Sequence, residues 1–184
     1  MEKKDLDWGN IGFSYMPTDK RYVANYKDGA WDEGGMTSDP NVVINECAGI
    51  LQYCQEIFEG LKAYTTEDGS IVTFRPDLNA ERMMDSARRL EMPPFPKERF
   101  LEAVDQVVKA NAAWVPPFGS GATLYLRPYM FATGPVIGVK PSQEYQFRLF
   151  GTPVGPYFKG GAKPLTLCVS DFDRAAPNGT GHVK

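Results

Sequence analysis

The chain has 184 residues, a formal net charge of −3, and hydrophobic and charged contents of 42% and 23%. These values are typical of a globular protein and argue against disorder, collagen and a coiled coil. Lysine and arginine are scattered along the sequence, which argues against binding to nucleic acid or to an acidic membrane. We therefore expect small molecules or other proteins as partners.

The cysteines and the first residues point to a compartment. Cys47, Cys54 and Cys168 are odd in number and lack the spacing of a metal site, which fits a reducing environment. The first residues have mixed charge and no apolar run, and no segment reaches the length of about 20 apolar residues that spans a bilayer. We expect a cytoplasmic protein without a bound metal.

The first part of the sequence predicts two hairpins with a helix between them. Residues 20–32 and 61–74 each place β-favouring residues on both sides of an Asp-Gly pair, which is typical of a hairpin. Apolar residues recur at steps of three and four over 46–57, which predicts a short helix. Glu56 and Glu59 then lie near the end of this helix. Exposure of the two carboxylates to solvent at the helix end explains these residues better than a two-carboxylate glycosidase site.

Two amphipathic helices follow at 76–92 and 97–114, ending before Pro93-Pro94 and Pro116-Pro117. Apolar, β-rich runs come next at 122–131 and 145–151. This order predicts an α+β fold. The segment 151–164 is dense in glycine and proline and predicts a linker. One further strand is expected at 165–170, although about twenty residues are too few for a second core.

A few polar residues are candidates for chemistry from their positions alone. Lys184 follows a strand and a glycine-rich turn, where α/β proteins often bind ligands, but this spacing by itself favours a solvated lysine. Arg82 in the helix at 76–92 could face either a cleft or bulk water. Tyr125 and Arg127 share one strand face, which suits a carboxylate ligand and equally well cross-strand pairing. His182 is the single histidine and lacks a serine motif, so we set histidine catalysis aside.

Five consecutive blocks of sequence carry a resemblance to one family. YCQEIFEGLKAY at 53–64 resembles the QxxFEGxKAY segment of branched-chain amino-acid aminotransferases. FRPDLNAER at 74–82 resembles the FRPxxNxxR segment of the same family. LYLRP at 124–128, PVGPYF at 153–158 and RAAPNGTGHVK at 174–184 follow in the family's order and at close to its spacing. The resemblance therefore runs from about Phe13 to Lys184.

The resemblance implies the fold type IV architecture of pyridoxal-phosphate enzymes, in which a small α/β sandwich domain and a larger C-terminal domain enclose the cofactor. We expect the small domain at 1–152, the interdomain linker at 153–164 and only the beginning of the C-terminal domain at 165–184. The implied reaction transfers the amino group of leucine, isoleucine or valine to 2-oxoglutarate through a Schiff base. We expect the 184 residues alone to be inactive.

Two alternatives stay open at this point. One is a related fold type IV enzyme, a D-amino-acid aminotransferase or an aminodeoxychorismate lyase, against which FEGLKAY and LYLRP argue. The other is an inactive small domain that only folds or dimerises.

The resemblance also implies roles for individual residues. Lys184 is expected to be the catalytic residue that carries pyridoxal phosphate, and Arg82 to bind the cofactor phosphate. Arg127 is expected to receive the distal carboxylate of glutamate. The aromatic positions expected to line the substrate pocket are Phe13, Tyr53, Phe58, Tyr125 and Tyr157. Ile137 and Val139 resemble a loop that reaches the pocket of a neighbouring subunit, which implies a homodimer, with plain loop packing as the alternative.

Overall fold

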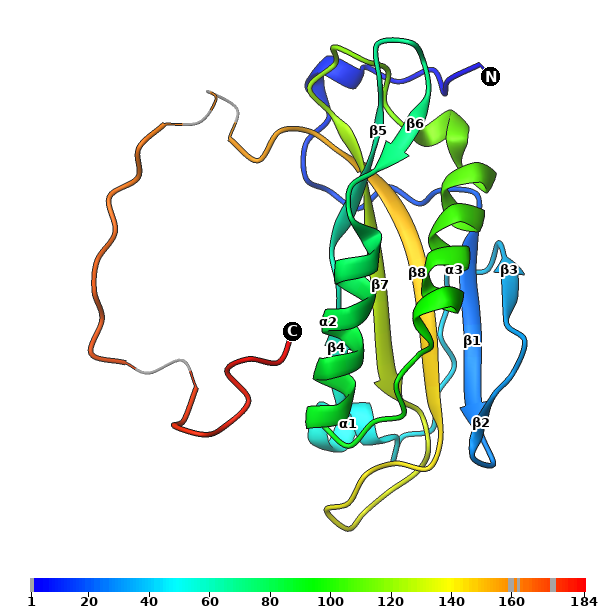
Figure 1. Cartoon of the computed structure of the whole chain (residues 1–184), viewed down its shortest axis with the longest axis vertical. Helices are drawn as coiled ribbons and strands as arrows, with labels where there is room; N and C mark the ends of the chain where they lie inside the picture. The colour runs from blue at the N-terminus through cyan, green and yellow to red at the C-terminus, as the bar shows by residue number, and fades with distance from the viewer. Residues whose placement is uncertain (1, 159–160, 162, 173–174) are drawn as a thin grey trace.

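The computed structural model describes residues 2–158, 161, 163–172 and 175–184. The helices are α1 Gly49–Tyr53, α2 Pro76–Arg89 and α3 Lys97–Ala110, with 3₁₀ turns at Trp8–Asn10 and Ala112–Trp114. The strands are β1 Arg21–Lys27, β2 Ala30–Trp31, β3 Gly35–Thr37, β4 Glu56–Phe58, β5 Leu61–Thr65, β6 Ile71–Thr73, β7 Thr123–Ala132 and β8 Tyr145–Val154. Figure 1 shows one curved sheet with α2 and α3 on the same face. This arrangement confirms the expected α+β fold.

The long strands β7 and β8 form the middle of the sheet. In the described residues the eight strands form one sheet in the order β2-β1-β8-β7-β5-β6, with β3 beside β1 and β4 beside β7. All pairs are antiparallel. The pairing of β7 with β8 runs from Thr123↔Val154 to Ala132↔Tyr145. A residue's position along β7 therefore decides on which face of the sheet it lies.

The pleat of β7 separates a core face from an open face. Leu124 and Leu126 are fully buried and belong to the hydrophobic core that also contains residues of α2 and α3. Because alternate residues of a strand point to opposite faces, Tyr125 and Arg127 lie on the face away from these helices. The candidate residues of β7 are therefore on the open face.

The two hairpins and the two amphipathic helices are confirmed. β1 and β2 are joined by Asp28 and Gly29, whose φ angles of 53° and 83° are the positive values that a tight two-residue hairpin turn requires. β5 pairs with β6 in the second hairpin. The helix expected at 76–92 ends at Arg89, and the helix expected at 97–114 ends at Ala110 before a 3₁₀ turn. Apolar periodicity with proline stops was sufficient to predict the two helices, and the Asp-Gly pairs were sufficient to predict the two hairpins.

The helix expected at 46–57 is wrong for most of its length. Only Gly49–Tyr53 is helical, and Cys54 ends the helix in a left-handed conformation with φ of 52°. Glu56–Phe58 instead forms β4, which pairs with β7 and buries Ile57 to 1% exposure. The pairing with β7 satisfies the backbone and buries Ile57, which outweighs the local helical pattern.

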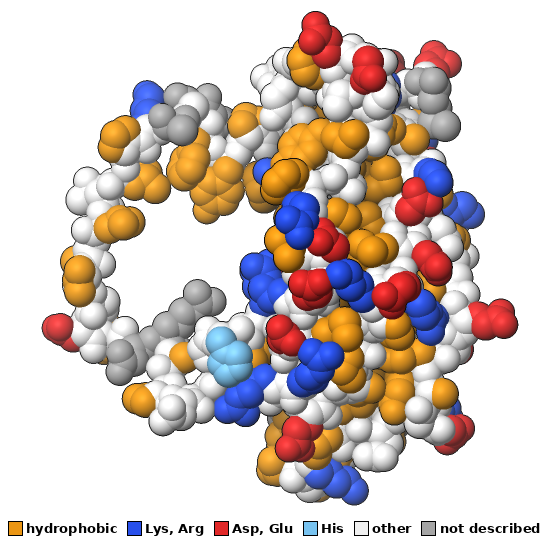
Figure 2. All heavy atoms as spheres, in the orientation of Figure 1, with side chains coloured by type: hydrophobic (Ala, Val, Ile, Leu, Met, Phe, Trp, Pro, Cys, Tyr) orange, Lys and Arg blue, Asp and Glu red, His pale blue; other side chains and the backbone are white. Residues whose placement is uncertain are grey.

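The strand expected at 165–170 is also wrong, because these residues have no regular secondary structure. Leu165, Leu167 and Val169 are exposed, and Figure 2 shows apolar side chains along this segment, away from the sheet. A strand needs a neighbouring strand for its backbone groups, and the described residues offer none here. β8 continues to Val154 and so includes the first residues of the expected linker. Positions 159, 160, 162, 173 and 174, which fall in the expected linker and C-terminal segment, lie outside the described residues, and the division into domains stays a prediction.

The outer surface of α2 and α3 carries interspersed charges of both signs (Figure 2). Exposed ion pairs join Lys97 to Glu81 and Arg88 to Asp85 on this surface. Among the described residues, we find no helix with both the length and the apolar character needed to span a bilayer.

Candidate active site

Lys184 is held against α2 and the end of β4 by its backbone. Its amide donates a hydrogen bond to Ser86 Oγ at 3.0 Å, and its carbonyl accepts one from the amide of Phe58 at 3.2 Å. The C-terminal segment therefore returns to the body of the fold, as its red end beside α2 shows in Figure 1. The side chain of Lys184 extends over Phe58, with Nζ 4.5 Å from the centroid of the ring.

Arg127 approaches the same phenyl ring from β7. Its Cζ lies 4.4 Å from the centroid of Phe58 and 5.3 Å from that of Tyr125. Its Nε and Nη2 donate to the hydroxyl of Tyr125 at 3.2 Å and 3.1 Å. The structure therefore brings together Phe58, Tyr125, Arg127 and Lys184. The amine of Lys184 and the guanidinium of Arg127 suit a ligand that has a carbonyl and a carboxylate.

Gly60 and Glu56 shape the surroundings of this group. A Cβ atom at Gly60 would clash with the hydroxyl of Tyr125, so a glycine is required for the observed position of that ring. Burial raises the pKa of the Glu56 carboxyl, and the positive charge of Arg127 opposes that rise. Glu56 shares a face of β4 with Phe58, so a partly buried acid lies within electrostatic range of Arg127.

Arg82 forms a two-pronged ion pair with Glu59. Its Nε lies 2.6 Å from Oε1, and its Nη2 lies 2.7 Å from Oε2. Asn79 Nδ2 donates to the same carboxylate at 2.8 Å. The Glu59 side chain has 0% exposure and that of Arg82 has 53%. The hydrogen bonds to Glu59 raise the pKa of Arg82 above its ordinary value.

The expectation that Glu59 is solvated at a helix end is wrong. The pairing of β4 with β7 carries Glu59 inward, where its amide donates to the carbonyl of Pro128 at 2.7 Å. A signal for its partners was present in the sequence, because Asn79 and Arg82 are three residues apart and therefore share one face of α2. What the sequence could not show is that this face meets the residue after Phe58.

No family model matches the chain. Over 181 residues it is 56% identical to the branched-chain-amino-acid aminotransferase of Haemophilus influenzae, a match that covers 98% of this chain and 53% of the relative. Along nearly its whole length, the chain is homologous to part of the branched-chain amino-acid aminotransferases. It spans about half the length of the curated relatives it matches.

Solved structures of branched-chain aminotransferases have a similar fold. The enzyme of Escherichia coli superposes with a TM-score of 0.64 at 25% identity, over 88% of this chain and 49% of that chain. The T.th. enzyme, solved in complex with N-(5′-phosphopyridoxyl)-L-glutamate, superposes with a TM-score of 0.50 at 24% identity, over 69% of this chain and 40% of that chain. The second likeness is one of fold alone.

The other residues singled out by the aminotransferase resemblance form two separate groups. The hydroxyl of Tyr53 at the end of α1 donates to the carbonyl of Ile137, and Tyr53 and Val139 line one surface hollow. Phe13 and Tyr157 pack edge to face with centroids 5.6 Å apart. In the part of the chain that is described, neither group has a hydrogen bond or ring contact with Phe58, Arg127 or Lys184. All five side chains are substantially exposed.

The residues around Lys184 fit pyridoxal phosphate as a ligand. Arg82 and Ser86 are four residues apart on α2, so their Cβ atoms are about 6 Å apart on one face. Because Ser86 holds the backbone of Lys184, neighbouring turns of α2 position Lys184 and the guanidinium of Arg82. Glu59 occupies Nε and Nη2 of Arg82, and Nη1 makes no hydrogen bond within the described residues. The role of Arg82 as a phosphate ligand stays a prediction.

Proposed function

We propose that this chain supplies the catalytic lysine and part of the substrate pocket of a pyridoxal-phosphate-dependent branched-chain aminotransferase. The proposed reaction transfers the amino group of leucine, isoleucine or valine to 2-oxoglutarate. The observation that carries the proposal is the placement of Lys184 Nζ and the Arg127 guanidinium on the ring of Phe58, at 4.5 Å and 4.4 Å from its centroid. The similarity in sequence to proteins named branched-chain-amino-acid aminotransferase, at 56% and 48% identity, supports this choice of reaction.

Bound pyridoxal phosphate supplies a carbonyl that condenses with amines and an electron sink for the substrate carbon. Lys184 would supply the amine that condenses with this carbonyl and, once released, would take up the proton from the Cα atom of the amino acid. A lysine suits both tasks because its amine is a nucleophile and, when deprotonated, a base. The ring of Phe58 flanks this amine and limits the access of water on one side.

Arg127 explains how one pocket could accept both an aliphatic side chain and a carboxylate. With glutamate bound, its guanidinium would donate to the distal carboxylate. With leucine bound, the same guanidinium keeps its hydrogen bonds to the Tyr125 hydroxyl and its contact with the ring of Phe58. The cation is thus satisfied in both states, and the two rings provide apolar walls.

The exposed group formed by Tyr53, Ile137 and Val139 is proposed to complete the pocket of a second copy of the chain. These side chains are 41%, 74% and 89% exposed, and the hydrogen bond from Tyr53 to Ile137 links α1 to the loop after β7. A homodimer working in the cytoplasm is part of the proposal. Sedimentation that shows only monomers of the full-length protein would contradict the dimer, and a membrane or exported fraction in cells would contradict the location.

The proposal is tested by the absorption spectrum of the full-length protein with pyridoxal phosphate, recorded before and after L-leucine is added. We expect a band at visible wavelengths that shifts with L-leucine, because the amino acid displaces Lys184 from the cofactor. D-Leucine serves as the control and should leave the band unchanged. A shift with D-leucine alone would indicate the related D-amino-acid enzyme. A folded protein with no band would indicate a domain that does not catalyse the reaction.

Replacing Arg127 with leucine should separate the two substrates. We expect the Arg127→Leu variant to raise the KM for 2-oxoglutarate roughly 10- to 100-fold, because hydrogen bonds to a charged group contribute about 1.5–3 kcal/mol. The KM for L-leucine should change by no more than about threefold, since its side chain contacts only apolar walls. Steady-state kinetics with each substrate varied in turn measures both values. Equal increases for the two substrates would mean that Arg127 only maintains the pocket.

A further inference from the structure

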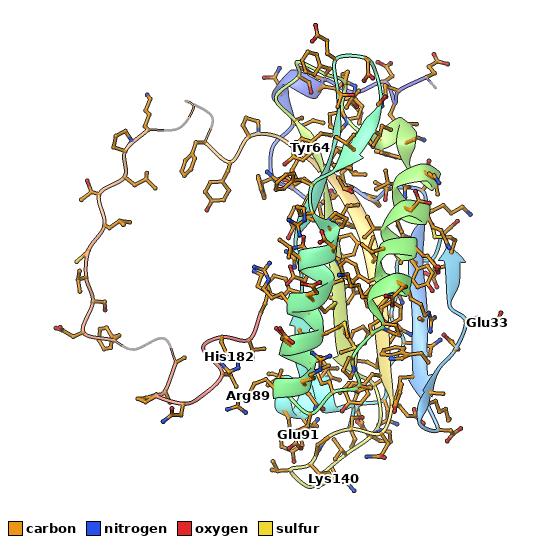
Figure 3. All side chains as sticks on the ribbon, in the orientation of Figure 1. Glu33, Tyr64, Arg89, Glu91, Lys140 and His182 are labelled. Atoms are coloured by element: carbon orange, nitrogen blue, oxygen red, sulfur yellow. The ribbon has the colours of Figure 1, made fainter. Side chains whose placement is uncertain are left out.

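The last turn of α2 holds the returning C-terminal segment at two places. Arg89 Nη2 donates to the backbone carbonyls of Asn178 and Gly179 at 3.1 Å and 3.3 Å. Ser86, three residues earlier on the same face, accepts the hydrogen bond from the amide of Lys184 at 3.0 Å. Figure 3 shows Arg89 at the end of α2 beside the segment that carries His182.

We propose that Arg89 and Ser86 form a clasp that docks residues 178–184 on α2 and thereby positions the amine of Lys184 beside Phe58. Arg89 and Ser86 are positioning residues, since neither is placed to touch the substrate. The role assigned to Lys184 rests on the proposed function, whereas the docking of the segment does not.

The segment has little else to hold it in place. Turns within it join Gly179 to Ala176 and Val183 to Thr180 by backbone hydrogen bonds. Val183 packs against the hydrophobic core, but the other residues from 175 to 184 are exposed apart from Gly179. These turns shape the segment but do not attach it to a helix. Fixing its free backbone costs conformational entropy, and this cost opposes attachment. Within the described residues, the contacts that attach it are those of Arg89, Ser86 and Val183, together with the amide and the ring of Phe58.

The neighbouring arginine shows that the contact of Arg89 is specific. Arg88 points along its own helix and pairs with Asp85 at 2.7 Å, with both side chains more than half exposed. Arg89 directs its guanidinium to two carbonyls of a segment about ninety residues later. The two positions have the same side chain on the same helical turn, so Arg88 is a matched control for charge, length and helix propensity.

The docking is tested by hydrogen exchange on the 184-residue chain. We expect Arg89→Ala to speed exchange of the amides of residues 178–184 about fivefold or more, since the loss of one hydrogen-bonding partner changes an opening equilibrium by about that factor. The amide of Phe58 should also exchange faster, because its acceptor is the carbonyl of Lys184. Arg88→Ala should leave these amides within about twofold of wild type. Equal exchange in the two variants would overturn the clasp.

Ser86→Ala removes the other half of the clasp. Because the Ser86 hydroxyl is buried, its variant is compared with wild type by circular dichroism before exchange is measured. We expect faster exchange at Lys184 in particular, with the amides near Asn178 changed less. Unchanged exchange at Lys184 in a folded Ser86→Ala protein would contradict the proposal.

The positioning role is tested on the full-length protein by trapping. Borohydride fixes pyridoxal phosphate on whichever lysines it has condensed with, and peptide mass spectrometry reports the share found at Lys184. We expect most of the label at Lys184 in wild type and in Arg88→Ala, and a share several-fold lower in Arg89→Ala. An unchanged share in Arg89→Ala would overturn the positioning role. Wild-type protein without label at Lys184 would refute the proposed function, and the exchange result would still decide the docking.

Discussion

Replacing Lys184 with alanine should lower the kcat of the full-length protein at least about 1000-fold. Proton transfer by a positioned side chain contributes about 10²–10⁴-fold by itself, and Lys184 would also lose its role as the amine that condenses with the cofactor. The rate is measured with L-leucine and 2-oxoglutarate at saturating pyridoxal phosphate. The variant should still bind the cofactor without covalent attachment, because the remaining pocket residues are unchanged.

Two controls distinguish chemistry from charge at Lys184. Lys184→Arg keeps a positive charge, but a guanidinium does not lose its proton at neutral pH. The kcat of this variant should therefore fall almost as far as that of Lys184→Ala. Lys163→Ala removes an exposed lysine from the expected linker, about twenty residues before Lys184, and should retain wild-type activity. Substantial activity in Lys184→Arg would show that position 184 contributes only charge, and the assignment of the catalytic lysine would be wrong.

Replacing Arg82 with leucine should lower the free energy of unfolding by about 3 kcal/mol. The substitution leaves the carboxylate of Glu59 buried without its partner, and breaking a buried ion pair in this way costs about 3–5 kcal/mol. The lower end applies because the Arg82 side chain is 53% exposed and its charge is partly screened by solvent. Urea unfolding followed by circular dichroism measures the change.

A double-mutant cycle identifies the cause of that loss. Glu59→Gln removes the buried charge, so Arg82→Leu should cost less in the Glu59→Gln background than alone. Arg88→Leu breaks an exposed pair on the same helix and should cost no more than about 0.5 kcal/mol. If Arg82→Leu and Arg88→Leu cost the same, the pair of Arg82 with Glu59 would not be the buried interaction that the distances indicate.

Local sequence signals were enough for the elements whose own residues decide their structure. The helices α2 and α3 have apolar faces with proline stops, and the Asp28-Gly29 turn has the chemistry of a tight hairpin. Residues 46–57 show the limit of such signals, because the partner that makes a strand of Glu56–Phe58 is β7, about seventy residues later in the chain. The same holds for 165–170, where an apolar pattern has no strand beside it in the described residues.

For the candidate site, the motifs were sufficient to select Phe58, Tyr125, Arg127 and Lys184, because each belongs to a block that resembles one family. That Lys184 and Arg127 lie over one ring depends on β4 pairing with β7 and on Ser86 holding the returning backbone. No local pattern contains these contacts. They are hydrogen bonds between residues far apart in sequence, and only the folded chain places their partners within reach.

The burial of Glu59 is the clearest case of a property decided by tertiary structure. Its own neighbours in sequence are compatible with a solvated acid, and nothing in that segment shows a cation nearby. The structure places it at 0% exposure between Asn79 and Arg82 of α2. A carboxylate tolerates such burial only where cations and donors replace its lost water, and α2 brings those groups to Glu59 when the chain folds. The candidate residues could therefore be selected from sequence motifs, whereas the contacts of Glu59, Lys184 and Arg89 were decided by tertiary packing.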